Sequence, residues 1–201
     1  MSTESNALSR RAALRRTAAL LGGLVSAPVW SGVLSGCTAS DAPNWTPIVF
    51  SPEQVETVAA LADGIIPATD TPGARDANVH RFIDAMVGDG FLDEDRNRFL
   101  AGLSDLMQRI QDTHQAAFPD LEPPTQMDEL TALDNATFGP DAPPPDPEAP
   151  SFYRMLKELV LTGYYTSEIG ATQELHMNII PGSYDGDVPL TDIGRAWVRG
   201  Y

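Results

Sequence analysis

Proline placement sets the strongest limit on how this chain can fold. Nine of its 17 prolines lie between positions 119 and 150, and each proline removes a backbone donor and clashes with the preceding helical turn. The run from Pro140 to Pro147 therefore cannot propagate a helix. We interpret residues 119–150 as an exposed connector rather than a domain boundary, with a sequence compatible with a short helix from Thr125 to about Asn135.

Ahead of this connector, apolar residues recur at helical spacing. The first such stretch predicts a helix over about residues 52–66. It opens with Ser51-Pro52-Glu53-Gln54, a capping box with proline at the first helical position, and it is stopped by Pro67. Residues 69–74 then have the composition of a turn, because proline fixes one backbone dihedral and glycine permits the other.

Two further helices are predicted before the connector. The spacing of apolar residues predicts one near residues 76–88, ended by glycines. Another begins at Asp93-Glu94-Asp95, whose negative charges suit the positive end of a helix, and runs to about residue 117.

The chain after the connector predicts one more strong helix and an irregular tail. Ser151 caps this helix, for which Gly163 and Gly170 are the expected break points. Residues 178–201 are expected to be mostly ordered loop, with a short helical turn around 192–198. The fold class predicted from these patterns is all-α, a small helical domain of about four to six helices with long Pro/Gly-rich loops.

Composition excludes several classes of function. Lys and Arg total 13 against 28 Asp and Glu, so the net charge is −15 and the pI about 4.3. Such a chain repels phosphate backbones, and nucleic acid is therefore not an expected partner. A single cysteine excludes a disulfide framework and a cysteine-rich metal site held by this chain alone, and three histidines leave little material for metal binding.

The N-terminal region is typical of an export signal. Ser9-Arg10-Arg11-Ala12-Ala13-Leu14 resembles the twin-arginine signal, in which Arg10, Arg11 and Leu14 are read by the twin-arginine translocase. A weakly apolar run, rich in glycine and alanine, follows over residues 17–33. A transmembrane helix is the alternative, but glycines and a proline interrupt the run.

Leu34-Ser35-Gly36-Cys37 resembles a bacterial lipobox, in which Cys37 is acylated and becomes the mature N-terminus. We therefore expect residues 1–36 to be a signal peptide, 37–47 a tether and 48–201 the helical domain of a periplasmic protein held at the membrane by lipid. An inert cysteine is the alternative. Removal of residues 1–36 takes away four arginines and one glutamate, which leaves 9 basic and 27 acidic residues and a net charge of −18.

The motifs of this sequence predict no catalytic, cofactor-binding or metal-ligating residue. Gly-rich nucleotide loops, a nucleophile elbow and H-E-x-x-H do not occur. Residues 93–97 open like a calcium loop, but Arg98 stands where that loop has glycine, and a solvated helix start is favoured. His176 lies near Glu168 and Glu174 and could act as an acid or base, although a packed histidine is favoured.

Four stretches follow one another in a recognisable order: Ile65-Ile66-Pro67-Ala68-Thr69-Asp70-Thr71-Pro72-Gly73-Ala74, Phe152-Tyr153, Gly163-Tyr164-Tyr165-Thr166-Ser167, and Pro181-Gly182-Ser183-Tyr184-Asp185-Gly186 ahead of Trp197. Behind a twin-arginine signal, this combination resembles the gluconate 2-dehydrogenase subunit 3 family over about residues 48–200.

The resemblance implies a small, cofactor-free subunit of a bacterial membrane-associated dehydrogenase that oxidises gluconate, glucose, fructose or related polyols. It also implies a large FAD-containing partner of the glucose-methanol-choline oxidoreductase type, commonly with a cytochrome c subunit that carries haem. Because the twin-arginine route carries folded proteins, the small subunit would escort the FAD-loaded partner. Asp187 stands where the family often has a cysteine, so a disulfide at that place is missing.

We therefore expect a non-catalytic subunit that escorts and anchors an FAD dehydrogenase. The alternatives are a stand-alone periplasmic scaffold or binding lipoprotein of the same fold, and an enzyme that uses His176. An obligate escort buries about 2,000 Å² or more with its partner, which predicts an exposed apolar patch. The candidate interface residues are Tyr164, Tyr165, Tyr184 and Trp197, although core packing explains the tyrosines of the fourth helix and the tryptophan about as well.

Overall fold

The computed structural model describes residues 45–178, 180, 182 and 187–199. The chain divides into two compact units, Met1–Thr46 and Pro47–Tyr201, and the second holds all the described helices and strands. Several sequence predictions fall on residues outside the described ones and stay predictions: the signal residues Arg10, Arg11 and Leu14, the lipidation site Cys37, and Tyr184.

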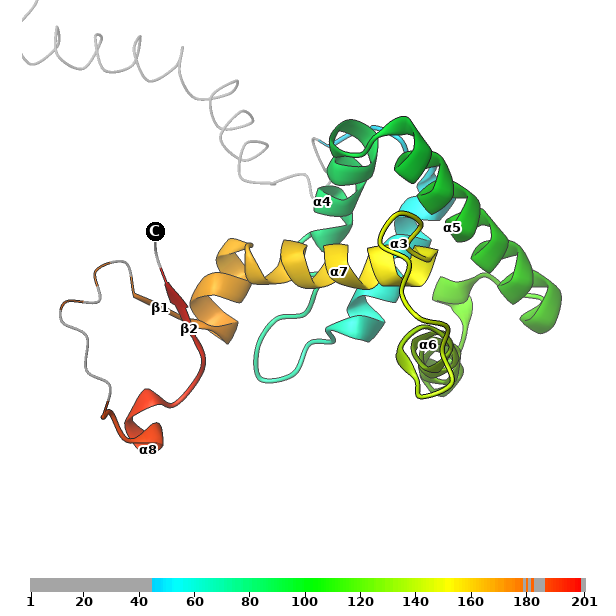
Figure 1. Cartoon of the computed structure of the whole chain (residues 1–201). Coiled ribbons are helices and arrows are strands. Elements are labelled where there is room, and N and C mark those ends of the chain that lie inside the picture. The colour runs from blue at the N-terminus through cyan, green and yellow to red at the C-terminus, as the bar shows by residue number, and fades with distance from the viewer. Residues whose placement is uncertain (1–44, 179, 181, 183–186, 200–201) are drawn as a thin grey trace, which may run out of the picture. The chain divides into compact units, whose positions relative to one another are not determined.

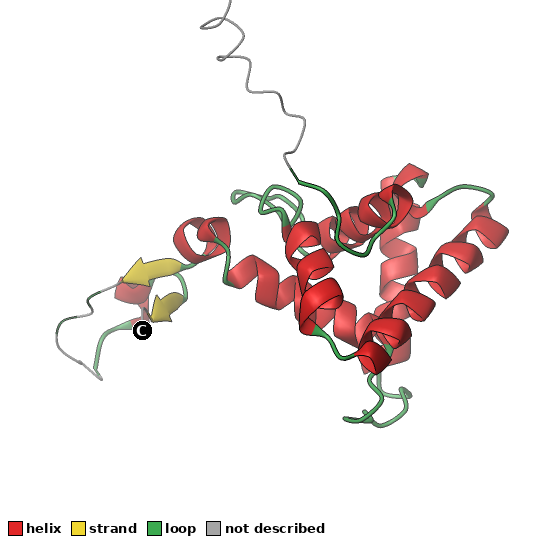
Figure 2. Cartoon of the chain, turned by 90° about the horizontal axis from the view of Figure 1, so that it is seen from above, coloured by secondary structure: helices red, strands yellow, loops and turns green. Residues whose placement is uncertain are grey.

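Helices make up most of the second unit (Figures 1 and 2). In chain order the elements are α3 (Pro52–Ile65), α4 (Val79–Ala85), the π-helical turn η1 (Met86–Gly90), α5 (Asp93–His114), the 3₁₀ turn η2 (Phe118–Asp120), α6 (Pro123–Phe138), α7 (Phe152–Tyr165), the π-helical turn η3 (Gly170–Glu174), β1 (His176–Asn178), α8 (Leu190–Ile193) and β2 (Trp197–Arg199). The two short strands pair in parallel. The prediction of a small all-α domain is confirmed.

Helices α3 and α7 begin as the sequence predicts. Ser51 Oγ accepts a hydrogen bond from the backbone N–H of Gln54 at 3.2 Å, and the Gln54 side chain accepts one from the N–H of Ser51 at 2.9 Å. These two bonds satisfy donors that a helix start otherwise leaves unpaired. Ser151 caps α7 in the same way by accepting the N–H of Arg154 at 3.4 Å.

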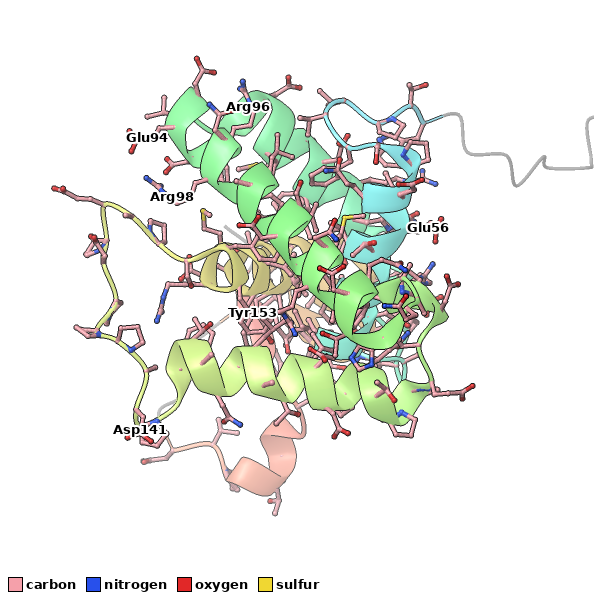
Figure 3. The ribbon with its side chains drawn as sticks, turned by 90° about the vertical axis from the view of Figure 1, so that its right-hand side faces the viewer. Glu56, Glu94, Arg96, Arg98, Asp141 and Tyr153 are labelled. Carbon is pink, nitrogen blue, oxygen red and sulfur yellow. The ribbon has the colours of Figure 1, made fainter. Side chains whose placement is uncertain are left out.

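The acidic start of α5 is paired with arginines one turn further along (Figure 3). Arg98 binds Glu94 at 2.9 Å and Asp95 at 2.5 Å, and Arg96 binds Asp93 at 2.8 Å. The carboxylates thus stabilise the helix N-terminus and also bind its own side chains. The interpretation of this segment as a charged helix start is confirmed.

The core lies where α7 crosses α4 and α5. Two glycines permit the close approach of these helices. A Cβ atom on Gly102 of α5 would lie 2.3 Å from the Cβ of Phe152, and one on Gly163 of α7 would lie 2.6 Å from Cδ1 of Phe82. Fully buried side chains surround these crossings: Val58, Leu61, Val79, Ile83, Val87, Phe99, Leu103, Ile110, Leu156, Val160 and Tyr164.

A buried carboxylate fixes the point where the chain enters the domain. Asp84 of α4 is fully buried. Its Oδ2 accepts the backbone N–H of Ile48 at 2.6 Å, and its Oδ1 accepts those of Val49 at 3.1 Å and Phe50 at 3.0 Å. Three hydrogen bonds to one carboxylate compensate for its removal from water. The segment before α3 is therefore held against α4.

Several predicted bounds require correction. The second helix begins at Val79 and not near residue 76, because Asn78 adopts a left-handed conformation with φ of 54°. Helix α5 ends at His114 and not near residue 117, because Gln115 is left-handed with φ of 56°. Helix α7 continues through Gly163 and ends at Tyr165.

The connector and the tail also differ from their predictions. Helix α6 occupies residues 123–138, longer than the predicted 125–135, and packs on α3. Of the connector predicted over residues 119–150, residues 140–150 are irregular, whereas α6 occupies residues 123–138. The expected helical turn at 192–198 is wrong, since helix α8 covers Leu190–Ile193 and strand β2 covers Trp197–Arg199.

Candidate interaction surface

The loop between α3 and α4 has a fixed, tightly closed shape. The backbone N–H of Ala74 donates to the carbonyl of Ile66 at 2.9 Å and closes the loop. Gly73 is required by a close approach, because a Cβ atom there would lie 2.6 Å from the backbone nitrogen of Ala68. The turn predicted for residues 69–74 is confirmed.

This loop is attached to the C-terminal end of α7 and to η3. The Tyr164 hydroxyl donates to the carbonyl of Pro72 at 2.7 Å, and the Thr71 hydroxyl donates to Oε2 of Glu174 at 2.6 Å. Burial raises the pKa of Tyr164 above its ordinary value, so the phenol stays protonated and able to donate. Tyr164 is only 1% exposed. Its prediction as part of an exposed patch is wrong, because its side chain holds the loop within the chain.

The neighbouring Tyr165 faces outward. Tyr165 is 39% exposed, and its ring packs edge-on against that of Tyr164, with ring centroids 5.3 Å apart. Leu161 lies one helical turn earlier, on the same side of α7, and is 40% exposed. The end of α7 thus presents an apolar pair to solvent.

Strands β1 and β2 follow α7 and η3 in the chain and carry Trp197. Its ring stacks on that of His176, with centroids 4.4 Å apart, and remains 46% exposed. Glu174, one of the two carboxylates considered as a partner of His176, accepts a hydrogen bond from Thr71 instead. The structure therefore brings His176 to a tryptophan and takes Glu174 to the α3–α4 loop, an arrangement that does not favour the acid–base pair considered from sequence.

Exposed apolar side chains gather in this part of the chain. The structure exposes ten large apolar side chains among the described residues, and six of them belong to the segment from α7 to β2: Leu161, Tyr165, Met177, Ile180, Val188 and Trp197. Exposed apolar groups that gather in one region mark interaction sites more often than scattered ones. Tyr165 and Trp197 were predicted as interface residues. The other four, Leu161, Met177, Ile180 and Val188, have neither the periodicity nor the aromatic rings from which an interface could have been predicted.

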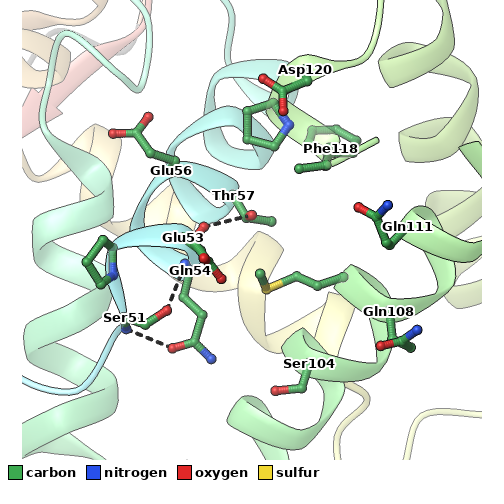
Figure 4. Close-up of a pocket in the computed structure, with 14 residues that line it drawn as sticks. Ser51, Glu53, Gln54, Glu56, Thr57, Ser104, Gln108, Gln111, Phe118 and Asp120 are labelled. Carbon is green, nitrogen blue, oxygen red and sulfur yellow. Dashed lines mark hydrogen bonds between the residues drawn. The ribbon is translucent and has the colours of Figure 1, made fainter. Parts of the chain in front are cut away.

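A separate groove of about 870 Å³ lies between the start of α3, the second half of α5 and η2 (Figure 4). Phe118 and Met107 supply apolar lining, while Glu53, Glu56 and Asp120 supply three carboxylates; none of the described residues that line it is basic. A groove of this charge favours cationic or neutral ligands. Sequence reasoning missed it, because its three walls come from distant segments.

Within residues 45–178, 180, 182 and 187–199, histidine, cysteine and acidic side chains nowhere gather in a group of three that could hold a metal ion. Every helix in the same residues is too short or too polar to span a bilayer.

The fold and surface define a small helical domain with an apolar region at the end of its last long helix. The sequence model of the gluconate 2-dehydrogenase subunit 3 family matches residues 52–182, from the start of α3 to just beyond β1. The chain belongs to this family, and it is therefore an accessory subunit of a dehydrogenase. Neither the curated proteins nor the solved structures gave a match.

Proposed function

We propose that the chain is the non-catalytic small subunit of a periplasmic, membrane-associated dehydrogenase that oxidises gluconate or a related sugar or polyol. The partner is an FAD-containing subunit of the glucose-methanol-choline type, accompanied in some complexes by a cytochrome c subunit with haem. The family match over residues 52–182 carries this proposal. The exposed apolar side chains in the segment from Leu161 to Trp197 support it, because a subunit needs apolar side chains that its partner covers.

The same proposal assigns the N-terminal region to export and anchoring. Arg10, Arg11 and Leu14 would direct the folded pair of subunits to the twin-arginine translocase, and lipid on Cys37 would hold the complex at the membrane. Several acyl chains on one residue give stable membrane binding, since each buried methylene contributes about 0.8 kcal/mol. In this arrangement the flavoprotein acquires FAD before export and needs no signal of its own.

Purification of the full-length chain, tagged after Tyr201 through a flexible linker, from detergent-solubilised membranes of the native cell tests the proposal. A co-purifying subunit with the absorbance of flavin, and sugar or polyol dehydrogenase activity in the same fraction, is the expected result. Replacement of Arg10 and Arg11 by lysine is expected to leave both subunits in the cytoplasm. Cys37→Ser is expected to release the exported complex from the membrane. Recovery of the chain alone and without flavin colour from these solubilised membranes would contradict the proposal.

The alternative is a stand-alone periplasmic scaffold or binding lipoprotein of the same fold. The groove lined by Glu53, Glu56 and Asp120 is the observation that favours it, because a binding protein needs such a cavity. Purification separates the two functions. A dehydrogenase subunit carries flavoprotein with it, whereas a binding lipoprotein is recovered alone and responds to Glu53→Gln in ligand binding.

A further inference from the structure

The described C-terminal part of the chain has regular structure without a core of its own. Among residues from 171 onward whose exposure is described, none is buried, and four are half-buried: Ala171, Glu174, Leu175 and Val198. Strand β1 packs on η3 and pairs with β2. In Figures 1 and 2 the two strands follow the C-terminal end of α7 and lie away from α3, α5 and α6.

Both faces of this strand pair carry exposed apolar side chains. Side chains alternate between the two faces of a strand, and the register sets His176 opposite Trp197 and Met177 opposite Val198. One face therefore carries the stacked rings of His176 and Trp197, and the other carries Met177, which is 43% exposed. Parallel strands in proteins are almost always covered on both faces. Here Met177 on one face and Trp197 on the other both remain exposed.

Free energy explains why such a pair needs a partner. Ordering a segment costs conformational entropy at every residue, and apolar side chains compensate for that cost only when they leave water. An isolated pair of short strands is marginally stable at best in water. The described chain buries no residue here, so a bound partner that covered the two faces would supply the burial that stabilises the strand pair.

We propose that the strand pair, β1 with β2, is the element that docks into the catalytic subunit, which covers both of its faces. This inference rests on the proposed function, because a chain from a family of dehydrogenase subunits has another subunit of the complex as its partner. Leu161 and Tyr165 extend the same interface along α7. The described sheet has only two strands, so each strand keeps one unpaired edge to which a partner strand can add.

One substitution on each face tests the docking. Met177→Ser and Trp197→Ala are made in the full-length chain, with Met127→Ser on α6 as the matched control, because Met127 is a methionine 51% exposed on another helix. Each tagged complex is immobilised from native membranes, and loss of flavin from the resin is followed with time. The first two variants are expected to lose flavoprotein at least about tenfold faster than the unsubstituted chain, and the control within about twofold.

Amide hydrogen exchange supplies a second measurement on the unsubstituted protein. Backbone amides of residues 176–178 and 197–199 are expected to exchange rapidly in the free chain and at least about tenfold more slowly in the complex. Unfolding of the three free variants is expected to match that of the unsubstituted chain, since their altered side chains are exposed. A structural role for Met177 or Trp197 would instead change that unfolding.

Three results overturn the inference, and they differ from one another. If the unsubstituted chain carries flavoprotein and all three variants retain it equally, the docking element is wrong and the proposed function stands. If the unsubstituted chain carries no flavoprotein, the proposed function fails and the inference fails with it. If strand amides become protected in the free chain as its concentration rises, a second copy covers the strands and the catalytic subunit does not.

Discussion

Replacement of Asp84 by alanine tests how the segment before α3 is attached. The carboxylate is fully buried and accepts the backbone N–H groups of Ile48, Val49 and Phe50 at 2.6, 3.1 and 3.0 Å. Alanine leaves these donors without their acceptor. Phe50 is buried and cannot exchange its lost bond for water, whereas Ile48 is 53% exposed and can.

The magnitude follows from these exposures. A buried donor left unpaired costs about 1–3 kcal/mol, and a donor that regains water costs less. We therefore expect Asp84→Ala to lower the free energy of unfolding by about 3 kcal/mol. Asp84→Asn retains one acceptor oxygen but turns an NH₂ group toward one of the donors, and a loss of about 1–2 kcal/mol is expected.

Denaturant titration followed by circular dichroism measures both values. Asp89→Ala is the matched control, because Asp89 is exposed five residues further along and its loss removes the same charge. Its effect is expected to stay within about 0.5 kcal/mol. Hydrogen exchange at residues 48–50 should accelerate in Asp84→Ala before the helices open. Equal effects of Asp84→Ala and Asp89→Ala would refute the reasoning, because net charge would then explain the loss.

Three further substitutions probe packing and electrostatics, each by denaturant titration. Gly102→Ala places a Cβ atom 2.3 Å from the Cβ of Phe152, an atom that no side-chain rotation can move away. We therefore expect the free energy of unfolding to fall by about 1–3 kcal/mol, although alanine has the better helix propensity. An unchanged denaturation midpoint would contradict this expectation. Tyr164→Phe removes the donor to Pro72 and is expected to cost about 1 kcal/mol; a variant as stable as the parent would show that the bond contributes nothing. Burial opposes ionisation of Glu129, but side-chain hydrogen bonds with His114 and Arg109 outweigh the effect of burial and hold the pKa of Glu129 below the ordinary 4.5. The stability that this carboxylate contributes is therefore present above pH 4.5 and is lost as the pH falls through its lower folded-state pKa. The stability difference between the unsubstituted chain and Glu129→Gln should accordingly shrink on acidification. A difference that grows would refute a lowered pKa for Glu129.

The elements that the sequence predicts well are those whose signals are local. The capping box Ser51-Pro52-Glu53-Gln54 and the following apolar stripe predict helix α3 to within one residue of its end. The length of helix α6 was underestimated, because Leu130 is its only buried residue among those described, and one buried residue cannot establish a helical period. The Asp84 hydrogen bonds join residues more than thirty positions apart, so no local sequence pattern predicts them.

The two adjacent tyrosines show what periodicity could have decided. Val160 and Tyr164 are four residues apart and both are buried, whereas Leu161 and Tyr165, shifted by one position, are both exposed. A helix turns by about 100° per residue, so neighbouring residues face different surroundings. Tyr164 continues the buried row of Leu156 and Val160 at a spacing of four residues, so its assignment to an exposed patch is inconsistent with helical periodicity. The strand pair had no such signal, because three-residue strands are too short to display one.

The helical body and the strand pair differ in what stabilises them, and this difference separates fold from function. The body buries its large apolar side chains between α3, α4, α5 and α7, so substitutions there act on unfolding whether or not a partner is bound. The strand pair buries none of its described side chains, so substitutions there act on association and leave unfolding of the free chain unchanged. A catalytic subunit that binds the strands can therefore discriminate among small subunits without altering how they fold.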